Sequence, residues 1–266
     1  MPQPSPLPLR GRRALVCGAS RGIGQATAIA LASAGASVVV LGRNADTLER
    51  DTLSQLPLIG DATHGLIAVD QNALVKLAPA VSSEAAEAPF HIWINNTGGP
   101  KAGPLAEATV AELEGAFHQH LSAAQTILQA VLPGMRAAGY GRIINVISTS
   151  VKQPIPGLGV SNTIRGAMAS WAKTLAGELG PQGITVNNVL PGFTATGRLD
   201  EIIAARATKQ GKSTDEIAAG MRSLVPAGRF AEPTEPAAAI AFLAGPAASY
   251  INGVNLPVDG GRTKSL

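Results

Sequence analysis

A short apolar run at residues 13–17 leads directly into a glycine-spaced segment, Gly18, Gly22 and Gly24, and then into a helical pattern over residues 25–33. Glycine allows the tight turn and the close backbone approach that such a junction needs. Unpaired amides and the dipole at a helix N-terminus favour an anion. The pattern predicts a strand–turn–helix unit that binds the pyrophosphate of a dinucleotide; the alternative is a tight turn without a ligand.

Apolar runs recur along the chain with helical patterns between them. Alternating strands and helices predict a parallel sheet, and the absence of polar alternation predicts that both sheet faces are buried. We therefore expect an α/β fold: a single doubly wound, Rossmann-type domain over residues 10–266, with a seven-stranded parallel sheet and helices on both faces. The predicted strands are residues 13–17, 37–41, 66–69, 92–95, 142–147, 185–190 and 254–258.

Three further segments have local signals. Residues 1–9 hold four prolines and are predicted to be a disordered tail, with a polyproline ligand as the alternative. Thr109 and Ser213 each precede a glutamate by three residues, which predicts capped helix starts. Residues 197–230 interrupt the strand–helix rhythm with two short helical patterns separated by Gly211, and we interpret them as a substrate lid.

Composition excludes several classes of protein. The net charge of +3 comes from scattered basic residues, which argues against nucleic-acid binding. Cys17 is the only cysteine, so no intramolecular disulfide or cysteine metal cluster is expected, and a reducing, cytoplasmic location is favoured. The histidines lack companions at metal-ligand spacing, and no apolar run reaches transmembrane length. We expect neither a metal nor a membrane partner.

The residue at the tip of the second strand indicates the cofactor. An acidic residue there would bind the ribose of NAD, but this chain has Gly42-Arg43. Arg43, together with Arg21, offers planar cationic donors for a 2′-phosphate, which predicts NADP(H). The alternative is that Arg43 is a solvated loop residue.

The remaining cofactor contacts are expected where other strands end. Asp70 follows the third strand and is a candidate acceptor for the adenine amino group, although a turn-capping aspartate would look the same. The amides of Asn95 and Asn96 at the end of the fourth strand are expected to brace the sheet, and Thr196 to lie near the nicotinamide. The full predicted set is Gly18, Ser20, Arg21, Gly22, Ile23, Gly24, Arg43, Asp70, Asn96, Gly98, Pro191, Gly192 and Thr196.

From about Arg12 to Gly261 the chain resembles the short-chain dehydrogenase/reductase family, and most generally its ketoacyl-carrier-protein reductase branch. The motifs that carry the resemblance are residues 18–24, 95–98, 143–148, 191–192 and 258–261. The resemblance implies a nicotinamide cofactor and hydride transfer between it and a carbonyl or alcohol.

The family's catalytic set departs from its usual form in this chain. The family uses an asparagine, a serine, and a tyrosine followed four residues later by a lysine. Ser148 matches the serine, but Ser161 and Arg165 stand at the tyrosine and lysine positions, and His120 stands where the asparagine is expected.

The chain has two tyrosines, Tyr140 and Tyr250, and neither maps to the site. Serine is too weak an acid to replace tyrosine alone. Histidine, with an ordinary pKa of about 6.5, suits proton exchange near neutrality, so His120 is the predicted proton donor. Arg165 is expected to stay protonated, so it is not a plausible general acid, and to polarise an oxygen or bind ribose hydroxyls; Ser148 and Ser161 are expected to hydrogen-bond the substrate oxygen.

Two functions follow as hypotheses. The first is an NADP(H)-dependent oxidoreductase with a remodelled proton donor, acting on a small, largely apolar and uncharged carbonyl or alcohol. The second is a non-catalytic NADP(H)-binding sensor or partner subunit, because a fold does not fix a function. Alanine-rich helices around residues 123–138 and 166–179 also predict a homo-oligomer, a tetramer or dimer.

Overall fold

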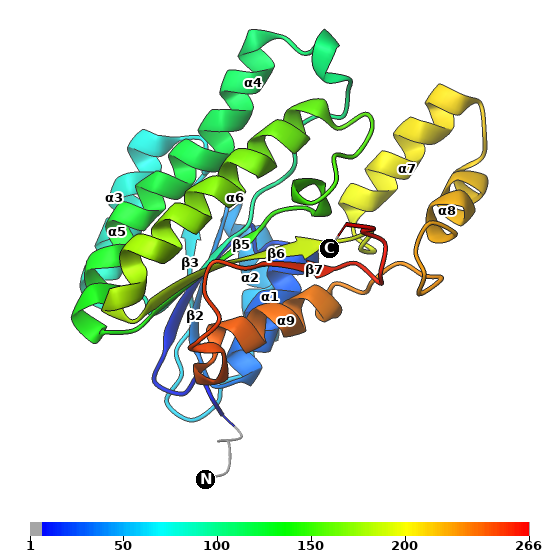
Figure 1. Ribbon diagram of the computed structural model, residues 1–266. Coiled ribbons are helices and arrows are strands. Elements are labelled where there is room, and N and C mark those ends of the chain that lie inside the picture. The colour runs from blue at the N-terminus through cyan, green and yellow to red at the C-terminus, as the bar shows by residue number, and fades with distance from the viewer. Residues whose placement is uncertain (1–6, 266) are drawn as a thin grey trace.

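The computed structural model describes residues 7–265. A parallel sheet lies between two layers of helices (Figure 1), and its strands are arranged in the order β3-β2-β1-β4-β5-β6-β7. The predicted doubly wound, seven-stranded fold is thereby confirmed. The strands are β1 (Arg13–Cys17), β2 (Ser37–Gly42), β3 (Gly65–Ala68), β4 (Ile92–Asn95), β5 (Gly141–Val146), β6 (Ile184–Pro191) and β7 (Asn255–Val258).

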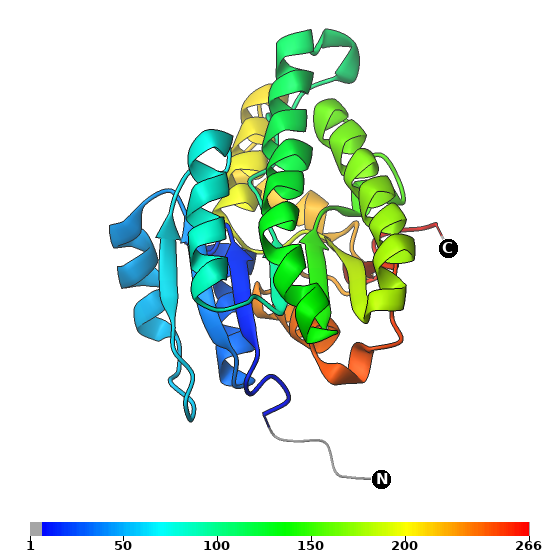
Figure 2. The same cartoon turned by 90° about the vertical axis from the view of Figure 1, so that its left-hand side faces the viewer.

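Helices cover both faces of the sheet (Figures 1 and 2). One face carries α1 (Gly22–Ser33), α2 (Ala45–Asp51) and α9 (Thr234–Ala244). The other carries α3 (Leu74–Glu87), α4 (Val110–Phe117), α5 (Ala123–Ala138) and α6 (Gly159–Leu179), with a π-helical turn, His118–Ser122, joining α4 to α5. Short 3₁₀ turns occupy Leu53–Gln55, Leu105–Glu107, Thr149–Val151, Gly180–Gln182 and Pro246–Ala248.

Each strand divides its side chains between two cores. In β1, Leu15 and Cys17 pack beneath α3 and α5, whereas Ala14 and Val16 pack beneath α1 and α9. Successive strand residues point to opposite faces. Because both faces are covered, the strand sequences are continuous apolar runs. Polar side chains that face solvent or a ligand therefore lie beyond the strand ends.

Asparagine side chains form a ladder across four neighbouring strands of the sheet. Asn95, Asn145, Asn188 and Asn255 are direct partners in the register of β4 to β7. Each Nδ2 donates to the next Oδ1, over 2.9, 2.9 and 2.8 Å. Buried amides are costly unless they are paired, and this ladder pairs them. The sequence predicted that Asn95 braces the sheet, but it did not predict that the ladder continues across β5, β6 and β7.

The chain start differs from the prediction. Leu9 is fully buried, and its N–H donates to the carbonyl of Ala34 over 3.0 Å. The prediction of a disordered tail over residues 1–9 is therefore wrong at Leu9, because this leucine fills the core beside α1. Residues 1–6 lie outside the described part of the chain.

The excursion after β6 has the predicted form. Helix α7 (Gly197–Gln210) and helix α8 (Thr214–Arg222) are separated by Gly211, whose φ of +62° ends α7. Both predicted capping boxes are present, at Thr109 and Ser213. Figure 1 shows α7 and α8 standing apart from the sheet layers, where they build a small apolar core of their own. Among residues 7–265, no helix has both the length and the apolar character to cross a membrane.

The ladder predicts a graded loss of stability. Asn145→Ala leaves a donor on Asn95 and an acceptor on Asn188 unpaired. We expect urea unfolding to show a loss of about 2–6 kcal/mol, since each buried unpaired group costs about 1–3 kcal/mol. The control is Asn255→Ala at the end of the ladder, which leaves only the Asn188 donor without its acceptor and should reduce stability less. Equal losses of stability in the two variants would contradict the ladder's role.

Candidate active site

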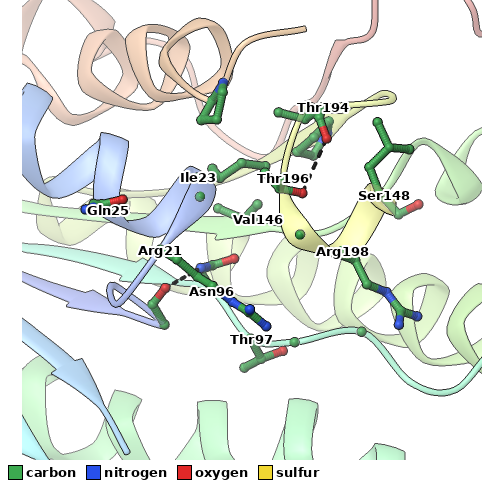
Figure 3. Close-up of a pocket in the computed structure, with 18 of the residues that line it drawn as sticks. Arg21, Ile23, Gln25, Asn96, Thr97, Val146, Ser148, Thr194, Thr196 and Arg198 are labelled. Carbon is green, nitrogen blue, oxygen red and sulfur yellow. Dashed lines mark hydrogen bonds between the residues drawn. The ribbon is translucent and has the colours of Figure 1, made fainter. Parts of the chain in front are cut away.

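A cavity of about 850 Å³ opens at the carboxyl ends of the strands. Its walls come from the segments that follow β1 to β6 and from the start of α7. The strand order reverses between β1 and β4, and ligands of open parallel sheets bind at such a switch point. Figure 3 shows side chains from these segments pointing into the space between α1 and α7.

The N-terminus of α1 forms one wall of the cavity. Its N-cap residue, Arg21, has an extended backbone, no side chain caps the helix, and its first turn holds no acidic residue. Gly18 and Gly22 take left-handed φ values of +59° and +61°, which glycine adopts without strain. Ser20, Arg21, Gly22 and Ile23 line the cavity. Uncapped amides facing open space fit the pyrophosphate of a dinucleotide.

Asn96 fastens the glycine loop to the end of β4. Its Nδ2 donates to the carbonyls of Cys17 and Gly18 over 3.3 and 3.2 Å. A Cβ on Gly18 would lie 2.8 Å from that amide, and one on Gly24 would collide with the Gly18 carbonyl. Gly24 does not line the cavity; its missing side chain lets α1 pack against the loop. Asn96 and Gly98 both line it.

The predicted adenosine end holds Arg43 and Asp70 in the cavity wall. Asp70 also accepts a hydrogen bond from the Asn72 N–H over 2.9 Å, so it shapes its own turn. Arg21 is directed elsewhere: its guanidinium lies 3.9 Å from Glu201 Oε1, at the start of α7. The structure therefore directs Arg21 toward α7 and leaves Arg43 at the exposed rim.

Pro191, Gly192 and Thr196 line the cavity where β6 ends. Thr196 precedes α7, and its methyl group would lie 3.1 Å from a Cβ on Gly22. A Cβ on Gly192 would lie 2.7 Å from the Asp259 Cα, so only glycine fits there. The end of β6 thus closes against the glycine loop.

Ser148, Ser161 and Arg165 all face the same cavity. Ser148 follows β5 and accepts a hydrogen bond from the Ser150 N–H over 3.1 Å, which orients its hydroxyl. Ser161 and Arg165 lie one turn apart on α6. The structure brings these three candidate residues together.

Arg165 is buried, at 7% exposed, and its Nη1 donates to the Val146 carbonyl over 3.0 Å. Burial, with a smaller effect from the charge of Arg198, lowers the pKa of Arg165 to about 10. Desolvation lowers the pKa because it disfavours the charged form of the guanidinium. It remains cationic at neutral pH.

His120 is not the proton donor that the sequence suggested. Its ring is buried and outside the cavity lining, with Nδ1 2.6 Å from Thr97 Oγ1 and no hydrogen-bond partner for Nε2 in the described part of the chain. Burial, reinforced by the charge of Arg165, lowers the pKa of His120 to about 3. A histidine that is neutral at physiological pH holds no proton to donate as an imidazolium.

The two tyrosines are excluded, as predicted. Tyr140 donates its hydroxyl to the Ala244 carbonyl over 2.8 Å and packs between Arg12 and Arg142. Tyr250 is fully exposed. Neither tyrosine lines the cavity.

Sequence reasoning missed several charged residues of the cavity wall. Arg198 and Glu201 come from the first turn of α7, and Arg262 from the segment after β7. With Arg21, Arg43 and Arg165 they make five arginines against two acids, Asp70 and Glu201. This lining carries more charge than the small, largely apolar and uncharged substrate of the first hypothesis would need. Two of these arginines could have been identified from the sequence, because each directly follows a glycine, at 197 and at 261.

Comparison with known proteins identifies the family to which the chain belongs. A family model described as Enoyl-(Acyl carrier protein) reductase matches residues 18–263. The chain is 33% identical over 273 residues to gluconate 5-dehydrogenase of Gluconobacter oxydans, which covers all of both chains. This chain belongs to the short-chain dehydrogenase/reductase family.

Other members of the family agree with this assignment. A 3-oxoacyl-acyl-carrier-protein reductase of Haemophilus influenzae is 33% identical to this short-chain dehydrogenase/reductase, over 95% of the chain and 98% of the relative. The structure of L-sorbose reductase from Gluconobacter frateurii, complexed with NADPH and L-sorbose, superposes with a TM-score of 0.90 at 28% identity, covering 98% and 100% of the two chains. These relatives are oxidoreductases.

The buried His120 predicts an acid-dependent stability difference. The folded-state pKa of about 3 lies below the usual 6.5, so the stabilising contribution of the neutral ring is complete above pH 6.5 and is lost as the pH falls toward 3. We expect His120→Asn to remove this loss, which amounts to about 1.4 kcal/mol per pH unit. Urea unfolding of both proteins at pH 7, 5 and 4 measures it. Parallel losses in the two proteins would contradict a lowered pKa.

Proposed function

We propose that this chain is an NADP(H)-dependent oxidoreductase that transfers a hydride between nicotinamide and the carbonyl or alcohol of a small substrate. The observation that carries the proposal is a single cavity joining the uncapped start of α1 to Ser148, Ser161 and Arg165. The NADPH complex of the superposed L-sorbose reductase supports the choice of cofactor.

The cofactor would be held by backbone and side chains already aligned along the cavity. The first amides of α1 would bind the pyrophosphate, and Asn96 and Gly98 would flank the adenosine ribose. Arg43 at the rim would bind the 2′-phosphate, and Asp70 the adenine amino group. Gly192 and Thr196 would face the nicotinamide half. When bound, the cofactor supplies the hydride.

The substrate oxygen would be met by donors on one side of the cavity. Ser148 and Ser161 offer hydroxyl hydrogens, and Arg165 offers a buried positive charge. As the carbonyl is reduced its oxygen gains negative charge, which a preorganised cation stabilises strongly where water is excluded. Arg165 stays cationic and stabilises this charge, and the proton that completes the reduction would come from solvent through the cavity.

We also propose that the chain forms a homo-oligomer, a tetramer or dimer. Phe117, at the end of α4, is half-exposed on the layer that contains α5 and α6. The proposal itself rests on the alanine-rich sequences of α5 and α6, whose small side chains allow close packing against a second copy.

Replacement of Arg165 tests the catalytic proposal. With NADPH and a panel of carbonyls, we expect wild-type turnover and a loss of about 10²–10³-fold in kcat/KM for Arg165→Ala, the usual cost of removing a group that stabilises the charge on the reacting oxygen. Reduction by the wild type should also fall as the pH rises through about 10, because the cationic form is then lost. The matched control is Arg50→Ala, an exposed arginine outside the cavity.

The double variant Ser161→Tyr/Arg165→Lys restores the family's usual pair. In an active wild type we expect it to alter the pH profile, because the proton would come from a different group. A wild type that binds NADPH but reduces no carbonyl above the uncatalysed rate would overturn the proposal and favour a non-catalytic sensor.

Cofactor choice is tested at Arg43. Arg43→Asp should raise KM for NADPH by roughly 10- to 100-fold, since a hydrogen bond to a charged group is worth about 1.5–3 kcal/mol. KM for NADH should stay the same or fall, because an acid at this position suits the free ribose. The comparison variant is Arg50→Asp, and an unchanged NADPH preference in Arg43→Asp would rule out the assigned role.

A further inference from the structure

The arginines of the cavity divide into two groups. Arg21 and Arg43 belong to the glycine loop and the end of β2, where the phosphates of the proposed cofactor would lie. Arg165, Arg198 and Arg262 come from α6, α7 and the segment after β7, beside the serines that would meet the substrate. The second group has no phosphate to neutralise, so its charge calls for another explanation.

Arg262 is held in place without an acidic partner. Its guanidinium stacks 4.3 Å from the centre of the Phe193 ring, and its Nη1 donates to Thr149 Oγ1 over 3.4 Å. Among the described residues it forms no ion pair. Asp259 attracts it electrostatically, but the Asp259 carboxylate accepts from the N–H groups of Gly261 and Thr263.

The other two arginines add positive charge that local acids do not cancel. Arg165 is buried and hydrogen-bonded only to a carbonyl, and the charge of Arg198 acts on it directly. Glu201, the one acid lining this end, is shared by Arg198 at 3.2 Å and Arg21 at 3.9 Å. Partial burial also lowers the pKa of Arg262, with the charge of Arg206 adding to the effect. Desolvated cations favour a bound anion.

The position of Arg262 indicates which part of a substrate it would meet. Its hydrogen-bond partner Thr149 directly follows Ser148, and Phe193 also lines the cavity. Ile155 and Leu158 add apolar wall nearby in the lining. A planar guanidinium matches a carboxylate in a two-point contact, and an aromatic ring beneath it keeps the plane fixed.

We propose that the substrate is a small oxo or hydroxy carboxylic acid, whose carboxylate binds Arg262 while its carbonyl or alcohol meets Ser148, Ser161 and Arg165. This inference rests on the proposed function and adds the substrate's charge to it. The apolar wall accommodates the short carbon chain between the two groups.

Paired probes test the charge separately from the chemistry. The series is 3-oxo-, 4-oxo- and 5-oxohexanoate, each beside its methyl ester. Binding is measured by calorimetry on the protein with NADP⁺, and turnover by NADPH oxidation. We expect at least one acid to bind about tenfold or more tightly than its ester, the effect of one charged hydrogen-bonded contact.

Variants assign that preference to Arg262. Arg262→Gln should raise Kd and KM for the acid by about tenfold or more and leave kcat and the ester nearly unchanged. Arg262→Lys should retain part of the preference, because it keeps the charge but loses the planar pair of donors. The control Arg222→Gln removes an exposed charge outside the cavity.

The outcomes separate the two proposals. Acid binding without NADPH oxidation would support the carboxylate site and contradict the oxidoreductase. Reduction of esters and acids with equal KM would support the oxidoreductase and overturn the carboxylate site. A preference for the acid that survives in Arg262→Gln would also overturn it.

Discussion

The sheet is buried on both of its faces, and this burial decides where polar chemistry can lie. Side chains of β1 alternate between two apolar cores, so neither face of the strand can carry a functional group. The amides that do enter the sheet are paired with one another, from Asn95 across to Asn255. Polar groups that must meet a ligand are therefore placed beyond the strand ends, where the cavity lies.

Burial also changes the chemistry of the residues beside that cavity. His120 and Arg165 are both basic groups taken out of water, and in both the charged form is disfavoured. The consequences differ because their ordinary pKa values differ: the imidazole is neutral near pH 7, whereas the guanidinium stays charged. In the proposed site Arg165 therefore contributes a fixed positive charge for the substrate oxygen.

The distribution of charge favours a different anionic group at each end of the cavity. The N-terminus of α1 and Arg43 at the rim suit phosphates at one end, and Arg262 on its aromatic support suits a carboxylate at the other. Glu201 lies between Arg21 and Arg198 and links the glycine loop to α7. The segment formed by α7 and α8 thus supplies charged side chains to the cavity wall in addition to covering it with apolar ones.

The sequence by itself determined the features that depend on neighbours along the chain. The order of strands and helices, the glycine junction after β1, the capping boxes and the break at Gly211 all follow from local periodicity, backbone freedom or hydrogen bonds spanning three residues. Only the tertiary structure decided which distant residues share a surface. It buried Leu9 and His120, continued the asparagine ladder across β5 to β7, and brought Arg262 beside Thr149. Protonation and pairing depend on those long-range contacts, because desolvation and charge act through space and not along the chain.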